Sequence, residues 1–496
     1  MSRPMNRDEV VQKVKQARIS GTPIFPVSTG LNWGYRAARA DGHGAEVMDL
    51  SGMNRILNAD EISVDHPVAV IEPGVTQGQL CEFLDRRCPA LSFNVTGSAR
   101  DTSIIGNALD RGVGYLGPRR EDLFGLEIVT GIGEVICTGF RRLGERSPLA
   151  HCHPYGLGPM LDGLFFQGNF GIVTSACFKL VPKAPVRVAV SLALRRESDL
   201  AALLDELARL KREAVMSTTT HVGNKVRTHS SLMYGVAGYL MRQCGVQAQA
   251  VELQAQKVLE RIVPHAWSSL GGISGTRAQV RAAVAEVRSR VKRWAQVRIV
   301  DDRLLASSYA LLHPLRRCSW ARDKAAAIAA MRPLHGLASG APTDAAVDNL
   351  LWRYGQPELP AHQFDRSRCG LLYISPALPM DGHFAADVVR QMTLIAAQHH
   401  HTLYVTLNIE TPTSLVAITN LLFDRGQTEA CERAHRCADA LWTYIRSRGL
   451  EVYRARDDMM DRLVDAASPY WRTVRALKQV FDPDNIIAPG HYNLTP

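Results

Sequence analysis

Two tyrosines and one arginine are the residues of this chain whose types point most directly to chemistry. Tyr35 ends a Gly-rich segment near the start of the chain, and Tyr453 and Arg454 are neighbours near its end. If folding brought them together, two phenols and a fixed positive charge would bind a phenolate oxygen, because charge-assisted hydrogen bonds favour the ionised form. The alternative is that Tyr35 is an ordinary buried tyrosine and that Tyr453 and Arg454 have no special role.

Glycine-containing stretches occur four times within the first 175 residues, and their density indicates one extended ligand. Glycine lets main-chain N–H groups approach a phosphate closely. None of the four matches the GxGxxG fingerprint or a Walker A loop, and each alone is typical of a turn. Together they favour a long dinucleotide held over several loops. The stretches are Gly30–Tyr35, Val70–Thr76, Thr102–Tyr115 and Gln167–Thr174.

The elements that must position these residues form two groups. Up to about residue 185, short β-rich runs alternate with glycine turns, which predicts an α+β domain. Its expected elements are a helix over 7–19 and strands over 23–27, 45–50, 68–71, 126–129, 135–138 and 171–181. The later order of strands and long helices predicts a second, layered α/β domain. Its expected strands are 188–194, 370–375 and 403–409, and its expected helices are 198–215, 246–262, 276–297, 384–399 and 429–448.

Composition excludes several classes of protein. A chain of 496 residues, 46% of them hydrophobic, is typical of a globular protein with two domains. The net charge is +10, but basic residues lie along helices that also carry acids, which argues against nucleic-acid binding. No apolar stretch approaches the roughly 18–20 residues that span a membrane, and the first residues are not a secretory signal. Ten scattered cysteines without a CxxC pair predict free thiols and a cytoplasmic location.

The histidines do not predict a metal site. His399, His400 and His401 are consecutive at the end of an expected helix, so their side chains point in different directions. His151 and His153 lack the companion ligands of a zinc motif. We therefore expect no metal ion.

The order and spacing of these motifs resemble one family. The four glycine stretches, the segment His153–Leu164, Tyr453-Arg454 and the ending Asp482–Gly490 are similar to the vanillyl-alcohol oxidase and 4-cresol methylhydroxylase family of FAD enzymes. The resemblance covers nearly the whole chain and is weaker in the middle. It implies an α+β fold with a PCMH-type FAD-binding domain over residues 1–187 and a cap domain over 188–450. Residues 451–496 would return to the FAD-binding domain.

The resemblance also implies which residues hold the cofactor. The loop from Ser28 to Gly34 would bind the FAD pyrophosphate, and the other glycine stretches would line the remainder of FAD. The cofactor residues carried over are Ser28, Thr29, Gly30, Leu31, Asn32, Trp33, Gly34, Gly74, Val75, Thr102, Ser103, Gly106, Asn107, Gly171, Ile172 and Val173.

The activity implied is oxidation of a para-substituted phenol at its benzylic carbon. Tyr35, Tyr453 and Arg454 match the positions that bind the phenolate oxygen in the family. Hydride transfer from the benzylic carbon to flavin N5 would leave a quinone methide, and an anionic oxygen accelerates that step.

Three features depart from the family pattern. The stretch Glu410–Ile418 contains neither the histidine nor the tyrosine that links the flavin covalently, and Asn32 and Trp33 stand where related flavoproteins have another attachment histidine. We therefore expect non-covalent FAD. The aspartate near N5 has no clear match: Glu121 or Asp122 could supply the acid/base group, or Arg120 could take that place. The N-terminus is short, which predicts an unpaired sheet edge.

Other readings keep the fold and change the function. The flavoenzyme could act on a non-phenolic alcohol, amine or hydroxy acid in a biosynthetic pathway. It could also be a flavin-binding subunit with little activity unless a partner is bound. A small-molecule substrate, a homodimer and an electron-acceptor protein are the expected partners.

Overall fold

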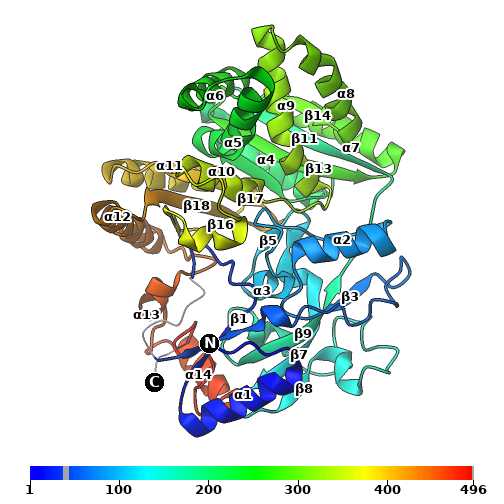
Figure 1. The fold of residues 1–496 in the computed structure, drawn as a ribbon, viewed down its shortest axis with the longest axis vertical. Helices are drawn as coiled ribbons and strands as arrows, with labels where there is room; N and C mark the ends of the chain where they lie inside the picture. The colour runs from blue at the N-terminus through cyan, green and yellow to red at the C-terminus, as the bar shows by residue number, and fades with distance from the viewer. Residues whose placement is uncertain (37–43, 494–496) are drawn as a thin grey trace.

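The computed structural model describes residues 1–36 and 44–493. Its lower part in Figure 1 is built from the beginning and the end of the chain, and its upper part from the middle. Helices and strands are mixed throughout, which confirms the expected fold class.

The first part of the chain forms two main sheets. The parallel pair consists of β1 (Ile24–Val27) and β2 (Glu46–Asp49). The antiparallel sheet has the order β3 (Val68–Ile71), β9 (Gly171–Lys179), β7 (Leu123–Thr130) and β8 (Val135–Cys137). Three helices accompany them: α1 (Arg7–Ser20), α2 (Gln77–Arg87) and α3 (Ile104–Leu109). Short ribbons pair β4 (Leu91–Ser92) with β10 (Val181–Pro182) and β5 (Val113–Gly114) with β6 (Gly117–Pro118).

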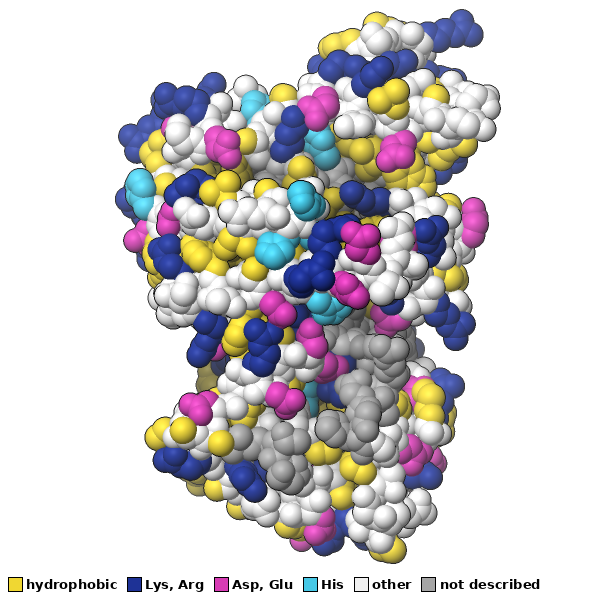
Figure 2. Space-filling model, turned by 90° about the vertical axis from the view of Figure 1, so that its left-hand side faces the viewer, with side chains coloured by type: hydrophobic (Ala, Val, Ile, Leu, Met, Phe, Trp, Pro, Cys, Tyr) yellow, Lys and Arg dark blue, Asp and Glu magenta, His cyan; other side chains and the backbone are white. Residues whose placement is uncertain are grey.

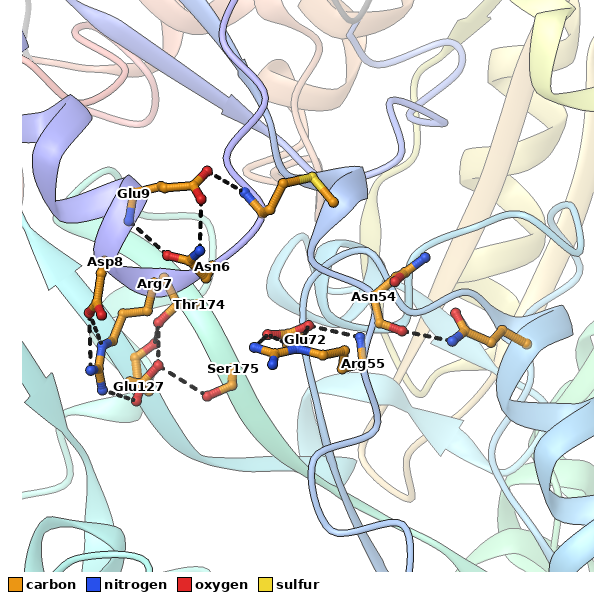
Figure 3. Close-up of polar contacts among 12 residues, drawn as sticks. Asn6, Arg7, Asp8, Glu9, Asn54, Arg55, Glu72, Glu127, Thr174 and Ser175 are labelled. Atoms are coloured by element: carbon orange, nitrogen blue, oxygen red, sulfur yellow. Dashed lines mark hydrogen bonds and ion pairs between the residues drawn. The ribbon is translucent and has the colours of Figure 1, made fainter.

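Polar contacts attach α1 to the antiparallel sheet (Figure 3). Asn6 caps the helix by accepting a hydrogen bond from the N–H of Glu9 at 3.0 Å. Arg7 reaches Glu127 of β7, with 3.4 Å between Nη1 and Oε2. Glu127 Oε1 also accepts a 2.7 Å hydrogen bond from the Thr174 hydroxyl of β9. The first helix is thereby held against two neighbouring strands.

The middle of the chain forms one antiparallel sheet of eight strands. Its order is β14-β11-β13-β12-β17-β18-β15, and β16 pairs with β18. The strands are β11 (Val186–Leu194), β12 (Thr220–Asn224), β13 (Trp267–Gly275), β14 (Ala295–Val300), β15 (Cys369–Tyr373), β16 (Ala377–Pro379), β17 (Tyr404–Ile409) and β18 (Ser414–Asp424).

Two groups of helices accompany this sheet. One group packs against it in a continuous apolar core: α4 (Leu200–Arg212), α7 (Arg277–Val291), α11 (Gly382–Gln398) and α12 (Thr428–Ser447). The other group has its own core and lies in the upper part of Figure 1: α5 (Lys225–Cys244), α6 (Ala248–Ile262), α8 (Asp302–Leu312) and α9 (Ser319–Ala338). The buried Val347 and Leu351 of α10 (Ala345–Arg353) belong to a separate apolar cluster.

Two sequence-based expectations were wrong in detail. The helix expected over 276–297 ends at Val291, and its last residues belong to β14, where β-branched Val297 and Ile299 pair with β11. The edge expected to be unpaired is contacted by the chain itself: Ser2 lies beside β2, donating to Val47 O at 3.0 Å and accepting from Asp49 N at 2.8 Å.

The end of the chain returns to the first sheets. After α13 (Met460–Leu463) and α14 (Pro469–Phe481), Ile487 lies beside Ile24 of β1. Ile24 donates to Ile486 O at 2.6 Å and accepts from Ala488 N at 2.8 Å. This pairing brings the two ends of the sequence together.

A buried ion pair holds this returning segment. Lys478 and Asp482 are 2% and 0% exposed, and Nζ donates to the Asp482 carboxylate at 2.7 Å. The same ammonium donates to the carbonyls of Ile487 and Asn169, and the carboxylate accepts from the N–H groups of Ile486 and Ile487. Both charges are therefore fully hydrogen-bonded, which makes their burial tolerable.

Removing one member of this pair is expected to destabilise the protein strongly. Lys478→Met leaves the Asp482 carboxylate buried without its cation, which costs about 3–5 kcal/mol. Urea unfolding followed by circular dichroism measures this loss. The control is Arg436→Met, which removes an exposed pair with Glu432 on α12 and should cost less than about 0.5 kcal/mol. Equal stability of the two variants would contradict the assigned role of Lys478.

Basic side chains form no single patch on the face shown in Figure 2. There, lysine and arginine side chains are interspersed with acidic ones. In the part of the chain that the structure describes, no helix is both long and apolar enough to cross a bilayer.

Candidate active site

A cavity of about 210 Å³ lies where the loops of the first domain meet the returning C-terminal segment. Loops after β1 and before α3 form part of its wall, and the start of β9 forms another part. Arg454, Ile487 and Ala488 contribute from the C-terminal segment. Twelve of the expected cofactor residues line it: Ser28, Thr29, Gly30, Leu31, Asn32, Thr102, Ser103, Gly106, Asn107, Gly171, Ile172 and Val173.

Four expected cofactor residues do not line this cavity. Trp33 packs on Phe364, with ring centroids 5.2 Å apart. Gly34 has φ +76° and allows Tyr373 to lie close, since an added Cβ would be 2.6 Å from its ring. Gly74 passes against the carbonyls of the neighbouring turn, and Val75 is buried in the apolar core. These four residues support the loops around the cavity.

The chemistry of the wall fits a dinucleotide. Within the described residues, the main-chain N–H groups of the cavity-lining residues 29–32 donate no hydrogen bond to the protein, so they are available to a phosphate. The hydroxyl of Thr102 is buried without a partner in the described part of the chain. Such a buried hydroxyl normally has a partner, so a ligand oxygen accounts for it.

Glycine allows α3 to approach the loop after β1 closely. A Cβ at Gly106 would overlap the Ser28 hydroxyl. Ser103 caps α3 by accepting from the N–H of Gly106 at 2.9 Å, and its own hydroxyl donates to Pro73 O at 2.6 Å. The helix and the loop therefore approach each other at a fixed spacing that a larger residue would change.

Tyr35, Tyr453 and Arg454 lie together, although more than 400 residues separate the first from the others. The two hydroxyl oxygens are 3.5 Å apart, and the Arg454 guanidinium carbon lies 4.1 Å from the centroid of the Tyr35 ring. Burial raises the pKa of both tyrosines, although the Arg454 charge opposes this rise. Both phenols therefore stay protonated at neutral pH and can donate to an oxyanion.

Arg454 is held by residues that the sequence did not single out for this purpose. Its Nη2 donates to Asn32 Oδ1 at 2.5 Å and forms an ion pair with Asp110. Asn32 Nδ2 donates in turn to Asp110 Oδ2 at 3.0 Å. Asp110 lies inside the third glycine stretch, and no local motif marks it, because its partner is 344 residues away. Burial alone would lower the pKa of Arg454. The charges of Asp110 and the two tyrosines outweigh burial, so the pKa is raised above its ordinary value.

The carboxyl groups expected near flavin N5 are Glu121 and Asp122, and their place beside N5 stays a prediction. Asp122 accepts a 2.8 Å hydrogen bond from Asn94, and burial raises its pKa to about 6. Glu121 and Arg120 are exposed, and the neighbouring Arg119 is fully buried instead. No described contact joins any of these residues to Tyr35, Tyr453 or Arg454.

Glu410 is the carboxyl group whose charge acts on Tyr453. It follows β17, burial raises its pKa to about 7, and its charge raises the pKa of Tyr453. Its Oε2 has no partner in the described part of the chain. A group with this pKa can exchange a proton near neutral pH. The loop from Glu410 to Thr413 contains no histidine or tyrosine that could link the flavin covalently. Non-covalent FAD is expected for this reason and stays a prediction.

The sheet of the middle domain lies against Tyr35 of the tyrosine and arginine cluster. The Tyr373 ring of β15 stacks on Tyr35, with centroids 4.7 Å apart and an interplanar angle of 6°. His221 of β12 lies against Tyr115, with ring centroids 4.7 Å apart. Among the described residues, no three His, Cys, Asp or Glu side chains are arranged to hold a metal ion.

Comparisons with known proteins agree with this architecture. A family model described as an FAD binding domain matches residues 2–139. The chain is 30% identical to 1'-carboxy-chondrochloren decarboxylase of Chondromyces crocatus, over 99% of this chain and 89% of that one. It is 28% identical to the flavoprotein subunit of 4-cresol dehydrogenase [hydroxylating] of Pseudomonas putida, over 97% and 85%. The structure of 4-ethylphenol oxidase from Gulosibacter chungangensis superposes with a TM-score of 0.82 at 23% identity, covering 99% and 88%.

These similarities extend over both domains and the returning segment. The chain belongs to the vanillyl-alcohol oxidase and p-cresol methylhydroxylase family of flavoproteins. It is an FAD-dependent oxidoreductase.

Enlarging Gly106 is expected to weaken FAD binding. Gly106→Ala pushes α3 away from the Ser28 loop, so the dissociation constant for FAD should rise about tenfold or more. Fluorescence titration of the deflavinated protein with FAD measures it. Gly97→Ala is the matched control, because the nearest atoms to its added Cβ are 3.9 Å away. Unchanged FAD affinity in Gly106→Ala would show that this close approach does not shape the cofactor site.

The raised pKa of Glu410 predicts how stability depends on pH. The folded protein keeps this proton up to about pH 7, whereas the unfolded chain loses it near 4.5. The contribution of the protonated Glu410 carboxyl group to the free energy of unfolding is therefore complete below pH 4.5, and it is lost as the pH rises to 7. Glu410→Gln should match the wild type at pH 4.5 and exceed its stability above pH 7, by at most about 3 kcal/mol.

Melting temperatures measured between pH 4.5 and 8 test this prediction. Glu252→Gln, an exposed position on α6, is the control for loss of a carboxylate. The prediction would be contradicted if the melting temperatures of Glu410→Gln and the wild type differed by the same amount at every pH.

Proposed function

We propose that this flavoprotein oxidises a para-substituted phenol at its benzylic carbon. The observation that carries the proposal is the convergence of Tyr35, Tyr453 and Arg454 beside the cofactor cavity. Two neutral hydroxyl donors and a cation favour a phenolate over a phenol. FAD, when bound, supplies the hydride acceptor.

Each residue then has a defined role toward the substrate. Tyr35 and Tyr453 donate hydrogen bonds to the phenolate oxygen, and Arg454 neutralises its charge. Charge leaves this oxygen as the benzylic hydride departs, so a preorganised cradle that keeps the substrate ionised raises the rate. Glu410 is placed to take or return a proton when water adds to the resulting quinone methide.

Loss of a carboxyl group is a second outcome of the same first step. One relative, at 30% identity, is named a decarboxylase. If a carboxylate is attached to the carbon beside the benzylic position, the quinone methide can release CO₂. The electrons of the broken carbon–carbon bond then form a vinyl group and restore the phenolate, so the same cradle serves this reaction.

The electron acceptor is a further part of the proposal. Another relative is a flavoprotein subunit, which favours a second protein as the acceptor. Oxygen is the alternative. Consumption of oxygen during turnover by the isolated chain distinguishes the two.

Anaerobic spectra of the purified holoprotein test the reaction. Addition of 4-hydroxybenzyl alcohol, 4-ethylphenol or eugenol should bleach the oxidised flavin band. Tyr453→Phe should retain FAD and slow the bleaching roughly a hundredfold, as expected when one donor to an oxyanion is removed. Tyr155→Phe, at a position that is 56% exposed, is the control.

Two results would overturn the proposal. If no phenol bleaches the flavin but an aliphatic alcohol, amine or hydroxy acid does, the substrate class is wrong. If Tyr453→Phe reduces its flavin as fast as the wild type, the tyrosine and arginine cluster does not bind the reacting oxygen.

A further inference from the structure

The sheet of the middle domain has two faces with different surroundings. Residues directly opposite each other on adjacent strands point to the same side. Val405, Leu407 and Ala417 are on the side covered by α4, α11 and α12, and each is 0% exposed. The other side carries Tyr373, which stacks on Tyr35 and so faces the candidate active site.

This inner face keeps accessible surface. His221 pairs with Asn408, Gly223 with Thr406, and Thr406 with Ile418, so their side chains share the face. His221, Thr406, Ile418 and Tyr373 are all partly exposed, in contrast to the fully buried residues behind them. Part of this face therefore stays accessible at these four residues.

Arg227 lies over this face. It is in the first turn of α5, directly after β12, and a Cβ at Gly223 would be 3.8 Å from Arg227 Cγ. The arginine stem therefore passes within van der Waals distance of this position. Burial raises the pKa of Tyr115 and of Tyr373, and in both residues the Arg227 charge is the first opposing influence. The guanidinium is thus near rings that surround the candidate site.

None of the residues that the structure describes neutralises the charge of Arg227. Across residues 1–36 and 44–493, the Arg227 guanidinium has no hydrogen bond and no carboxylate within ion-pair distance. The adjacent His221 is uncharged at neutral pH, because burial lowers its pKa to about 4. Its Nδ1 is bonded to Asn408 Oδ1 at 2.8 Å, and its buried Nε2 has no partner within the same ranges. The partly exposed Arg227 guanidinium therefore offers a positive charge, and the buried His221 Nε2 a polar atom, to an anionic part of a ligand.

We propose that Arg227 binds a carboxylate on the side chain of the substrate. The inference rests on the proposed function and specifies its substrate class: a phenol that also carries a carboxylate. Arg454 and Arg227 would then bind the two anionic ends, and the ring would lie between them. A guanidinium suits this task because its planar N–H donors match both oxygens of a carboxylate.

The same arrangement makes loss of CO₂ chemically balanced. With 3-(4-hydroxyphenyl)propanoate, removal of a benzylic hydride by FAD yields a quinone methide that still carries the carboxylate. Cleavage of the bond to the carboxylate carbon releases CO₂, and its electron pair forms 4-vinylphenolate. FAD is the only oxidant required, and one proton returns to the phenolate on release.

Calorimetric binding to the holoprotein tests the carboxylate site without turnover. The probes are 4-hydroxycinnamate, which has no saturated benzylic carbon, and its uncharged methyl ester. The wild type should bind the acid at least tenfold more tightly than the ester. Arg227→Gln should weaken acid binding roughly ten- to a hundredfold and leave ester binding unchanged. Arg227→Lys, which keeps the charge but not the fork, should fall between them.

Arg242→Gln is the matched control, because Arg242 is exposed in the last turn of the same helix. The inference would be overturned if the wild type bound the acid and the ester equally tightly, or bound neither. It would also be overturned if Arg227→Gln weakened the binding of both by the same factor.

Flavin bleaching separates failure of this inference from failure of the proposed function. If 4-ethylphenol bleaches the flavin but Arg227→Gln leaves acid binding unchanged, or weakens acid and ester binding equally, the phenol chemistry is retained and the carboxylate site is rejected. Arg227→Gln could instead weaken acid binding as expected while no phenol, including 3-(4-hydroxyphenyl)propanoate, bleaches the flavin. The carboxylate site would then be retained and the proposed oxidation rejected.

Discussion

The buried charge of Arg454 is the constraint around which the site is organised. Burying a guanidinium is costly unless it is paired and hydrogen-bonded. Asp110 pairs with the Arg454 charge and Asn32 accepts a hydrogen bond from its Nη2, from two separate loops of the first domain, while the Tyr35 ring lies beside it. Asp110, Asn32 and the Tyr35 ring must all be present around Arg454. This requirement fixes one arrangement of the C-terminal segment, the loop after β1 and the end of α3.

The second buried cation, Lys478, secures the same segment from the other side. Its ammonium group connects Asp482 with the carbonyls of Asn169 and Ile487. Asn169 and Ile487 also line the cofactor cavity. The C-terminal segment thus contributes the ion pair of Lys478 and Asp482 behind the cavity, and it contributes Arg454 at the substrate end of the cavity. The middle domain closes this end through the stacking of Tyr373 on Tyr35.

Much of the local structure could be predicted from the sequence because it depends on local patterns. β3 was expected at the residues where it lies, and α1, α4, α6, α11 and α12 were expected to within a few residues. The helix expected over 276–297 was too long, because the apolar Trp294, Ala295 and Val297 fit a helical period as well as a strand. Pairing with β11 decides between the two, and that contact is more than 100 residues distant. The expected domain boundaries remain predictions.

The sequence by itself determined the class of cofactor, the family and the candidate phenolate residues. Glycine spacing and the Tyr-Arg pair are visible in the chain because close backbone approach and fixed charge each require particular residue types. The tertiary structure alone decided which side chains accompany them. Asp110, Glu410 and Arg227 carry no local motif. Their roles arise from burial and from neighbours distant in sequence, which set a pKa or leave a charge unpaired only after the two domains have packed together.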